Sequence, residues 1–188
     1  MYMPQIIEKV GRNKKAFDIV SKLYEQSAIM MFEEIDSSTS FKTITQLLYL
    51  DSIETDEPVK LYINSPGGKV TSGLAIIDTI NVMSRKVDTV GIGECSSMAA
   101  VILLMGTGNR RALKNTRVML HSVSSGFFGN YHDHVVDFKE TEFLQNSLMK
   151  MISQKLNLPI EEVTEMTKRD AFFSAEECVK IGILDSII

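Results

Sequence analysis

Short apolar runs alternate with longer amphipathic stretches along this chain of 188 residues, and this alternation restricts the fold more than any other feature. The apolar runs have the length of buried strands; they cover residues 28–32, 59–63, 87–92 and 117–120. The longer stretches have helical length and spacing; they cover residues 17–25, 70–83, 98–105, about 135–156 and 159–166, with further helices expected after Ser40 and from Ser174. Strands that alternate with helices predict an α/β fold with a mainly parallel sheet and flanking helices.

Length and composition indicate one domain over residues 1–188, long enough to bury a core. A net charge of −4 gives no general attraction to nucleic acid. No apolar run reaches the roughly 20 residues of a membrane span, and the N-terminal residues lack a signal-peptide pattern. The two cysteines are too few for a disulfide framework, so we expect a reducing, cytoplasmic setting.

Three segments leave the carboxyl ends of predicted strands, which is where parallel sheets gather functional groups. They are residues 64–68, residues 93–97 and the segment from His121. Ser97 opens a buried helix, so its hydroxyl either caps that helix or acts as a nucleophile beside unpaired backbone N–H groups. His121 is either a structural histidine or the base that accepts the serine proton.

Two further features supply parts that such a nucleophile needs. Asp170 precedes two aromatic residues, so its carboxylate is either a solvated loop group or a partly desolvated group that orients an imidazole. Gly67 and Gly68 permit positive φ and close backbone approach, as in an oxyanion hole or in a plain tight turn. No Gly-Lys-Ser/Thr follows them, which excludes a phosphate-binding loop. The His-Asp-His run at 132–134 lacks further ligands at suitable spacing, so we expect no metal site there.

Over nearly its full length the chain resembles the ClpP family of caseinolytic serine proteases. The matching motifs agree with the family in order and spacing; they are residues 17–21 (FDIVS), 61–68 (LYINSPGG), 73–79 (GLAIIDT), 97–98 (SM), 115–121 (NTRVMLH), 169–170 (RD) and 174–177 (SAEE). The resemblance implies the ClpP/crotonase-like fold with a protruding handle helix. It also implies the activity of an ATP-dependent serine endopeptidase.

The resemblance implies a catalytic role for each matching residue. Ser97 would be the nucleophile, His121 the general base and Asp170 the group that orients the base. The backbone N–H groups of Gly68 and Met98 would form the oxyanion hole.

Substrate binding and assembly are implied in the same way. Ser125 and Gly126 would pair with the main chain of an unfolded polypeptide by strand addition. Residues 1–16 would form an axial segment, and residues of about 122–156 would form the handle region that interlocks two rings. The implied assembly is a homo-oligomer of two stacked heptamers around a chamber, fed by an AAA+ ATP-dependent unfoldase. The chain itself would need no cofactor.

The family docks its unfoldase in an apolar pocket on the outer ring face, and this chain keeps part of that apolar character. The apolar residues at the corresponding positions are Tyr62, Val82, Val90 and Ile92. Lys60 and Arg111 stand where aromatic residues are usual. Burying either charge without a partner is costly, so we predict a weaker or different unfoldase partner unless both charges reach solvent along their aliphatic stems.

Three alternatives stay open at this point. The first is a non-catalytic or regulatory ring subunit that assembles with another ClpP-type chain. The complete set of serine, histidine and aspartate argues against it. It stays open because of Glu94 before the proposed nucleophile, Ser122 and Val123 after the histidine, and the charged dock. The second is a crotonase-type acyl-CoA enzyme, which uses paired N–H groups without a Ser-His-Asp set. The third is a Ser-Lys peptidase, which would leave His121 without a role.

Overall fold

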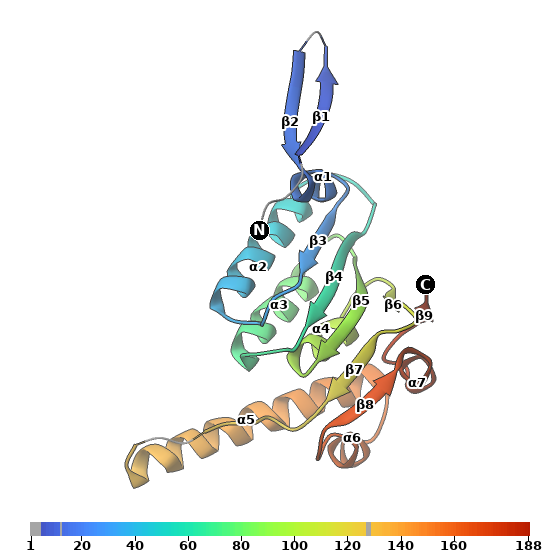
Figure 1. Cartoon of the computed structure of the whole chain (residues 1–188). Coiled ribbons are helices and arrows are strands. Elements are labelled where there is room, and N and C mark those ends of the chain that lie inside the picture. The colour runs from blue at the N-terminus through green and yellow to red at the C-terminus, as the bar shows by residue number, and fades with distance from the viewer. Residues whose placement is uncertain (1–4, 12, 127–128) are drawn as a thin grey trace.

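The computed structural model describes residues 5–11, 13–126 and 129–188, and a seven-stranded sheet forms the centre of this part of the chain (Figure 1). The strands are β3 (Ala28–Met31), β4 (Val59–Ser65), β5 (Val87–Ser96), β6 (Arg110–Ala112), β7 (Arg117–Leu120), β8 (Ala171–Ser174) and β9 (Ser186–Ile187). The order is β3-β4-β5-β6-β9, and β7 pairs with the last residues of β5. All of these pairs are parallel except β7 with β8. The predicted α/β fold with a mainly parallel sheet is confirmed.

Helices flank the sheet (Figure 1), and the apolar side chains of the sheet are buried. They are α1 (Ile19–Glu25), α2 (Ser37–Asp51), α3 (Val70–Val82), α4 (Met98–Leu104), α5 (Tyr131–Leu156), α6 (Ile160–Met166) and α7 (Ala175–Ile181). α2 packs against α3, and α4 packs against β4 and β5. Ile29, Leu61 and Ile63 of the sheet are fully buried, as are Ile76 of α3 and Ile102 of α4. Each such side chain contributes roughly 1.5–3 kcal/mol, so this layer is the stable core on which the site is built.

Two elements project from this core at opposite ends of the molecule (Figure 1). β1 (Gln5–Val10) and β2 (Asn13–Asp18) form an antiparallel hairpin at one end, and the start of α5 extends from the other. The first helix was predicted from residue 17 but begins at Ile19. Phe17 still belongs to the hairpin, and the Asp18 carboxylate caps the helix.

The two regions expected to serve in assembly are described only in part. Residues 1–4 and 12 of the axial segment, and residues 127–128 of the handle region, lie outside the described residues. α5 begins before the predicted residue 135, because Asn130 and Asp133 form a capping box at its start. Within the described ranges, none of the helices combines the length and the apolar character that crossing a bilayer requires.

β5 continues to Ser96, although the apolar pattern predicted a break at Gly93. Gly93 has a φ of 68°, and the pairing of β4 with β5 shifts register between Ile63 and Ser65, so the strand is irregular here but does not end. The extension pairs with β7 and sets Ser96 opposite Met119. It therefore places the carboxyl end of β5 beside the carboxyl end of β7.

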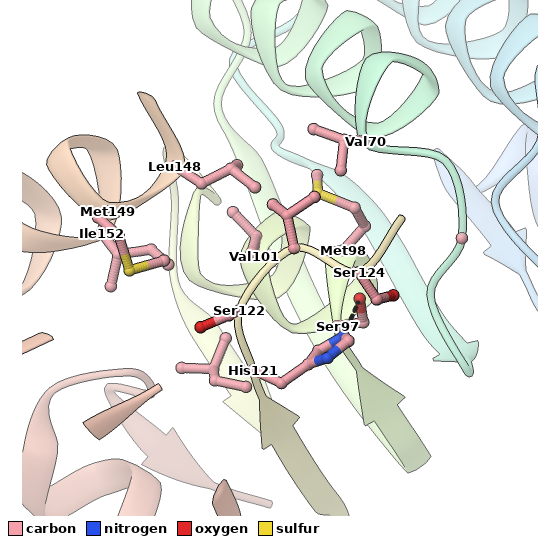
Figure 2. Close-up of a pocket in the computed structure, with 13 residues that line it drawn as sticks. Val70, Ser97, Met98, Val101, His121, Ser122, Ser124, Leu148, Met149 and Ile152 are labelled. Carbon is pink, nitrogen blue, oxygen red and sulfur yellow. Dashed lines mark hydrogen bonds between the residues drawn. The ribbon is translucent and has the colours of Figure 1, made fainter. Parts of the chain in front are cut away.

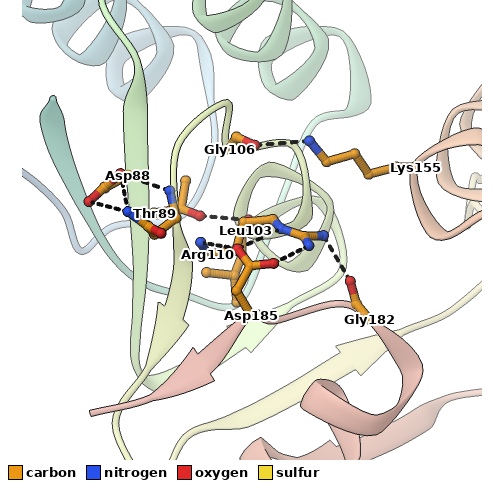
Figure 3. Close-up of polar contacts among 9 residues, drawn as sticks. Asp88, Thr89, Leu103, Gly106, Arg110, Lys155, Gly182 and Asp185 are labelled. Atoms are coloured by element: carbon orange, nitrogen blue, oxygen red, sulfur yellow. Dashed lines mark hydrogen bonds and ion pairs between the residues drawn. The ribbon is translucent and has the colours of Figure 1, made fainter.

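Polar contacts hold the segment before the C-terminal strand β9 against β6 (Figure 3). The Arg110 guanidinium forms an ion pair with Asp185 and donates to the Gly182 carbonyl at 2.8 Å. Lys155 of α5 donates to the Gly106 carbonyl at 2.9 Å. Burial alone would raise the pKa of Asp185, but the hydrogen bonds and charge of Arg110 outweigh it and hold that pKa below its ordinary value. These contacts locate β6 and β9, which are too short to give a periodic signal in the sequence.

Candidate active site

Ser97 is the first residue after β5 and stands immediately before α4. Its φ of 55° and ψ of −126° form a conformation that costs a non-glycine residue about 1–3 kcal/mol, so neighbouring contacts must hold it. One such contact is its N–H, which donates to the Met119 carbonyl of β7 at 2.8 Å. Among the described residues, the Ser97 side chain makes no capping hydrogen bond to α4. The interpretation of Ser97 as a plain helix cap is therefore wrong.

The Ser97 hydroxyl is hydrogen-bonded to His121 instead, as Figure 2 shows. The distance between Ser97 Oγ and His121 Nε2 is 2.8 Å. β5 and β7 are parallel neighbours, so their carboxyl ends bring the two residues to the same place. The His121 side chain is 23% exposed, which leaves the imidazole within reach of a substrate. This is the geometry that a histidine needs to take the proton of a serine.

Asp170 lies near the other ring nitrogen of His121, but at a greater distance. Its Oδ1 is 3.8 Å from Nδ1, beyond hydrogen-bond range, and its side chain is 64% exposed. Of the two readings that the sequence left open, the solvated loop carboxylate is therefore the one observed, and partial desolvation by the following aromatic residues is not. Phe172 is itself exposed, and Phe173 packs against the hydrophobic core. The structure thus joins Ser97 to His121 and leaves Asp170 adjacent but not bonded.

Gly67 and Gly68 bring a second backbone segment against Ser97. A β-carbon on Gly67 would lie 2.7 Å from the Ser97 β-carbon and 3.1 Å from the Met98 nitrogen. Gly68 has a φ of 147° and is bridged to Ile35, whose N–H donates to the Gly67 carbonyl at 2.7 Å. Glycine alone permits this approach, so the loop lies directly beside the first residue of α4. The support from Ile35 was not visible in the sequence, because that residue lies in an unpatterned segment before α2.

A pocket opens beside the bonded serine and histidine (Figure 2). Its apolar lining comes mainly from α3, α4 and α5, with one residue of β7, and includes Val70, Met98, Val101, Leu120, Leu148, Met149 and Ile152. Residues 122–124, which follow His121, form another wall. Of these side chains the sequence singles out Met98 alone, and only for its N–H, because which helix faces meet is a tertiary property. Such a surface suits an apolar side chain of a peptide.

The segment after His121 is held by side chains of α5 and, in the described part of the chain, belongs to no strand. The Val123 N–H donates to Gln145 Oε1 at 2.7 Å. The hydroxyls of Thr141 and Ser125 lie 3.1 Å apart. Ser125 and Gly126, the expected substrate-pairing residues, are exposed beside this helix. Gln145 and Thr141 could not be identified from the sequence, because a helical period does not show which polar residue meets a loop.

The apolar residues expected in the unfoldase dock are only partly exposed. Tyr62 of β4 and Val90 of β5 are direct neighbours, and Ile92 follows on the same strand. Val90 is buried, whereas Tyr62 and Ile92 are half-buried. Val82 ends α3 and is 78% exposed. Their docking role stays a prediction.

Lys60 and Arg111 both escape the penalty of unpaired burial. Lys60 is exposed. The Arg111 guanidinium forms a 2.8 Å ion pair with the buried carboxylate of Asp88, although its Nε has no hydrogen-bond partner among the described residues. Neither charge is therefore buried without a partner within the chain itself, and a penalty could arise only where an unfoldase covers them. A weaker or different unfoldase partner stays a prediction based on residue type.

Two side chains close to Ser97 in sequence have structural partners. Cys95 is fully buried, and burial raises the pKa of its thiol to about 12, so it carries no thiolate at neutral pH. The Ser96 hydroxyl donates to the Glu94 carboxylate at 2.8 Å.

In the ranges that the structure describes, there is no group of three or more His, Cys, Asp or Glu side chains that could hold a metal ion.

A family model described as Clp protease matches residues 11–188. The match spans the whole sheet and every helix of the described structure. It includes Ser97, His121 and Asp170, so the comparison and the geometry concern the same residues.

Proposed function

The chain belongs to the Clp protease family, and on this premise we propose that it is a serine endopeptidase that hydrolyses peptide bonds of unfolded polypeptides. The observation that carries the proposal is the 2.8 Å hydrogen bond between Ser97 Oγ and His121 Nε2 beside an apolar pocket. A serine hydroxyl is a weak nucleophile, and a histidine at this distance supplies the base that it lacks. Ser97, His121 and Asp170 are the proposed catalytic residues.

Peptide hydrolysis by Ser97 and His121 would proceed in two steps, acylation of the serine and hydrolysis of the acyl-enzyme. His121 Nε2 takes the hydroxyl proton while Ser97 Oγ bonds to the scissile carbonyl carbon, and the carbonyl oxygen becomes an oxyanion. The N–H groups of Gly68 and Met98 are the proposed donors to that oxyanion. The imidazolium then gives its proton to the departing amine and leaves an acyl-enzyme. His121 then takes a proton from a water molecule, whose oxygen bonds to the acyl carbon. The bond from that carbon to Ser97 Oγ breaks, the imidazolium returns its proton to Oγ, and the acid departs.

Asp170 is the proposed orienting group. Its carboxylate lies closest to Nδ1 of His121, the ring nitrogen that is not bonded to Ser97. A negative charge there stabilises the imidazolium that forms during attack. The contact must shorten by about 1 Å to become a hydrogen bond. We expect this shortening on assembly or on substrate binding, when catalytic contacts tighten.

The pocket beside Ser97 supports a proposal about the substrate, and membership of the family supports one about the assembly. The apolar pocket favours an apolar residue on the acyl side of the cleaved bond. Exposed Ser125 and Gly126 are the proposed partners for the main chain of an extended peptide. Proteins of this family generally form oligomeric rings with AAA+ partners. We therefore propose two stacked heptamers in the cytoplasm, with residues 1–16 at the axis and residues 122–156 between the rings.

Active-site labelling tests the catalytic proposal. A fluorophosphonate probe should label the assembled protein, and peptide mapping should place the label on Ser97. Ser97→Ala should abolish labelling and lower hydrolysis of a fluorogenic peptide roughly 10⁴-fold or more. Ser96→Ala is the matched control, because that hydroxyl is bonded to Glu94, and this variant should keep its label. Persistent labelling of Ser97→Ala would refute the nucleophile assignment.

A non-catalytic or regulatory ring subunit is the second candidate function. The 3.8 Å separation of Asp170 from His121 and the exposure of its side chain favour it. Native mass spectrometry of the chain purified alone, combined with a peptide hydrolysis assay, separates the two candidates. Active homomeric rings support the endopeptidase, and rings without labelling or hydrolysis support the regulatory subunit.

A further inference from the structure

A glutamine of α5 joins two walls of the pocket beside Ser97. The Val123 N–H, in the wall formed by residues 122–124, donates to Gln145 Oε1 at 2.7 Å. Gln145 precedes Leu148 and Met149 of the opposite wall by three and four residues. Residues at this spacing share one face of a helix. The amide that holds Val123 and the apolar side chains of the pocket therefore lie on the same side of α5.

Side-chain contacts set the distance between these walls, because the 122–124 wall has no strand partner in the described part of the chain. The Ser122 hydroxyl donates to the Thr167 carbonyl at 3.1 Å, and Ser125 meets Thr141 at 3.1 Å just beyond the wall. Both of these contacts use hydroxyls that can rotate to other partners. The contact of Gln145 differs, since it engages the backbone of the wall itself.

We propose that Gln145 is a specificity-determining residue, which sets the width of the apolar pocket by holding Val123 against α5. The inference rests on the proposed endopeptidase function and extends it, because it names what limits the size of the accepted side chain. Gln145 is a positioning residue that acts through the 122–124 wall. A neutral amide suits the position, because it accepts the N–H of Val123 without placing a charge beside the 122–124 wall.

Loss of the acceptor should change selectivity more than chemistry. A backbone N–H without its protein partner turns to water, so the 122–124 wall is expected to move away from α5. A wider pocket makes fewer contacts with a bound side chain and discriminates less between apolar side chains of different size. The hydrogen bond between Ser97 and His121 does not involve Gln145. The effect should therefore appear mainly in KM.

The test compares Gln145→Met with Gln145→Glu. Methionine keeps a similar length but offers Val123 no oxygen, whereas glutamate keeps the acceptor. Gln154→Met, at an exposed position of the same helix, is the matched control. Each variant is assayed as the assembled protein on two fluorogenic peptides that differ only in leucine or alanine on the acyl side of the cleaved bond.

We expect Gln145→Met to lower the leucine-to-alanine ratio of kcat/KM about 3- to 10-fold and to speed hydrogen exchange at the Val123 amide. Gln145→Glu should return the ratio to within about twofold of wild type, and Gln154→Met should not change it. An unchanged ratio in Gln145→Met, or equal losses in both Gln145 variants, overturns the inference while probe labelling of the wild type upholds the proposed function. A wild type that the fluorophosphonate probe does not label overturns the proposed function and this inference with it.

Discussion

The two halves of the proposed catalytic relay are built differently. Ser97 and His121 follow adjacent parallel strands and are hydrogen-bonded at 2.8 Å. Asp170 lies between α6 and β8, 3.8 Å from the imidazole, with a side chain that is 64% exposed. The sheet itself therefore positions the nucleophile and its base, whereas the acid depends on where a peripheral strand lies.

Strand pairing explains the difference between the two halves. β5 pairs with β4 on one side and with β6 and β7 on the other, and Ser97 is bonded to Met119 of β7. Among the described strands, β8 pairs with β7 alone, and its neighbours in the chain are the seven-residue helices α6 and α7. Elements with fewer packed contacts open and shift more easily. Asp170 is therefore expected to adjust its position more readily than Ser97 or His121.

The largest expected effect is a difference in peptide hydrolysis between a variant of His121 and a variant of Asp170. His121→Ala should lower kcat/KM about 10⁴- to 10⁶-fold on a fluorogenic peptide, because it removes the base. Asp170→Asn should lower kcat/KM by a factor that is roughly 10- to 100-fold smaller than the factor for His121→Ala, because the acid acts only through the imidazole. Native mass spectrometry of both variants checks that assembly is unchanged. Equal losses would contradict the comparison, since they would make Asp170 as tightly coupled as His121.

The second expected effect is a loss of stability when a side chain is added at Gly68, in the loop beside Ser97. Gly68→Ala should lower the free energy of unfolding by about 2–3 kcal/mol, because its β-carbon would collide with the Ile35 carbonyl at a positive φ. Gly11→Ala is the matched control in the hairpin: its φ is also positive, but no described atom lies within 4 Å of the added carbon. Gly11→Ala should lower the free energy of unfolding by about 1 kcal/mol. Urea denaturation measures both, and equal costs would show that the contact with Ile35 adds nothing.

The labelling rates of the two cysteines measure local opening separately in the strand before Ser97 and in the helix after β8. Cys95 lies in β5 and Cys178 in α7, and burial is the main reason that the pKa of each thiol is raised to about 12. Both should react with a thiol reagent only after local opening. We expect Cys178 to be labelled roughly tenfold faster than Cys95, because α7 lies at the periphery. Cys95→Ala and Cys178→Ala, labelled under native conditions, give the two rates, and a faster Cys95 would reverse the comparison.

The smallest expected effect concerns the anchor of the C-terminal region. Asp185→Asn weakens its contact with Arg110, and the 42% exposure of the Asp185 side chain limits the loss of stability to about 0.5–1 kcal/mol. The pKa of Asp185 is lower in the folded state than its ordinary value. Its contribution is therefore complete above the unfolded pKa and is lost as the pH falls through the lower folded pKa.

Urea midpoints measured from about pH 6 down to about pH 2 test this sign. The midpoint should fall less steeply in Asp185→Asn than in the wild type. Glu54→Gln, which changes a carboxylate at an exposed position outside the helices and strands, is the control and should follow the wild type. Parallel curves for all three proteins would exclude Asp185 as a pH-dependent anchor.

Local patterns in the sequence were sufficient for the fold class and for the parts of the candidate site. The apolar runs before Asn64 and before His121 predicted strands, and Gly67 and Gly68 predicted a close backbone approach. Both inferences succeed because hydrophobic periodicity and the conformational range of glycine are properties of short segments. The motif around Asp170 indicated the acid, but the sequence left open whether its carboxylate is solvated or partly desolvated.

Only the tertiary structure decided how these parts meet. It extended β5 past Gly93 to bring Ser97 to His121, left Asp170 at 3.8 Å, and set Ile35 and Gln145 against the two loops of the site. Such distances depend on how helices pack on the sheet and on how each strand pairs. They result from many weak contacts between residues far apart in the chain, and no short stretch of sequence contains those contacts.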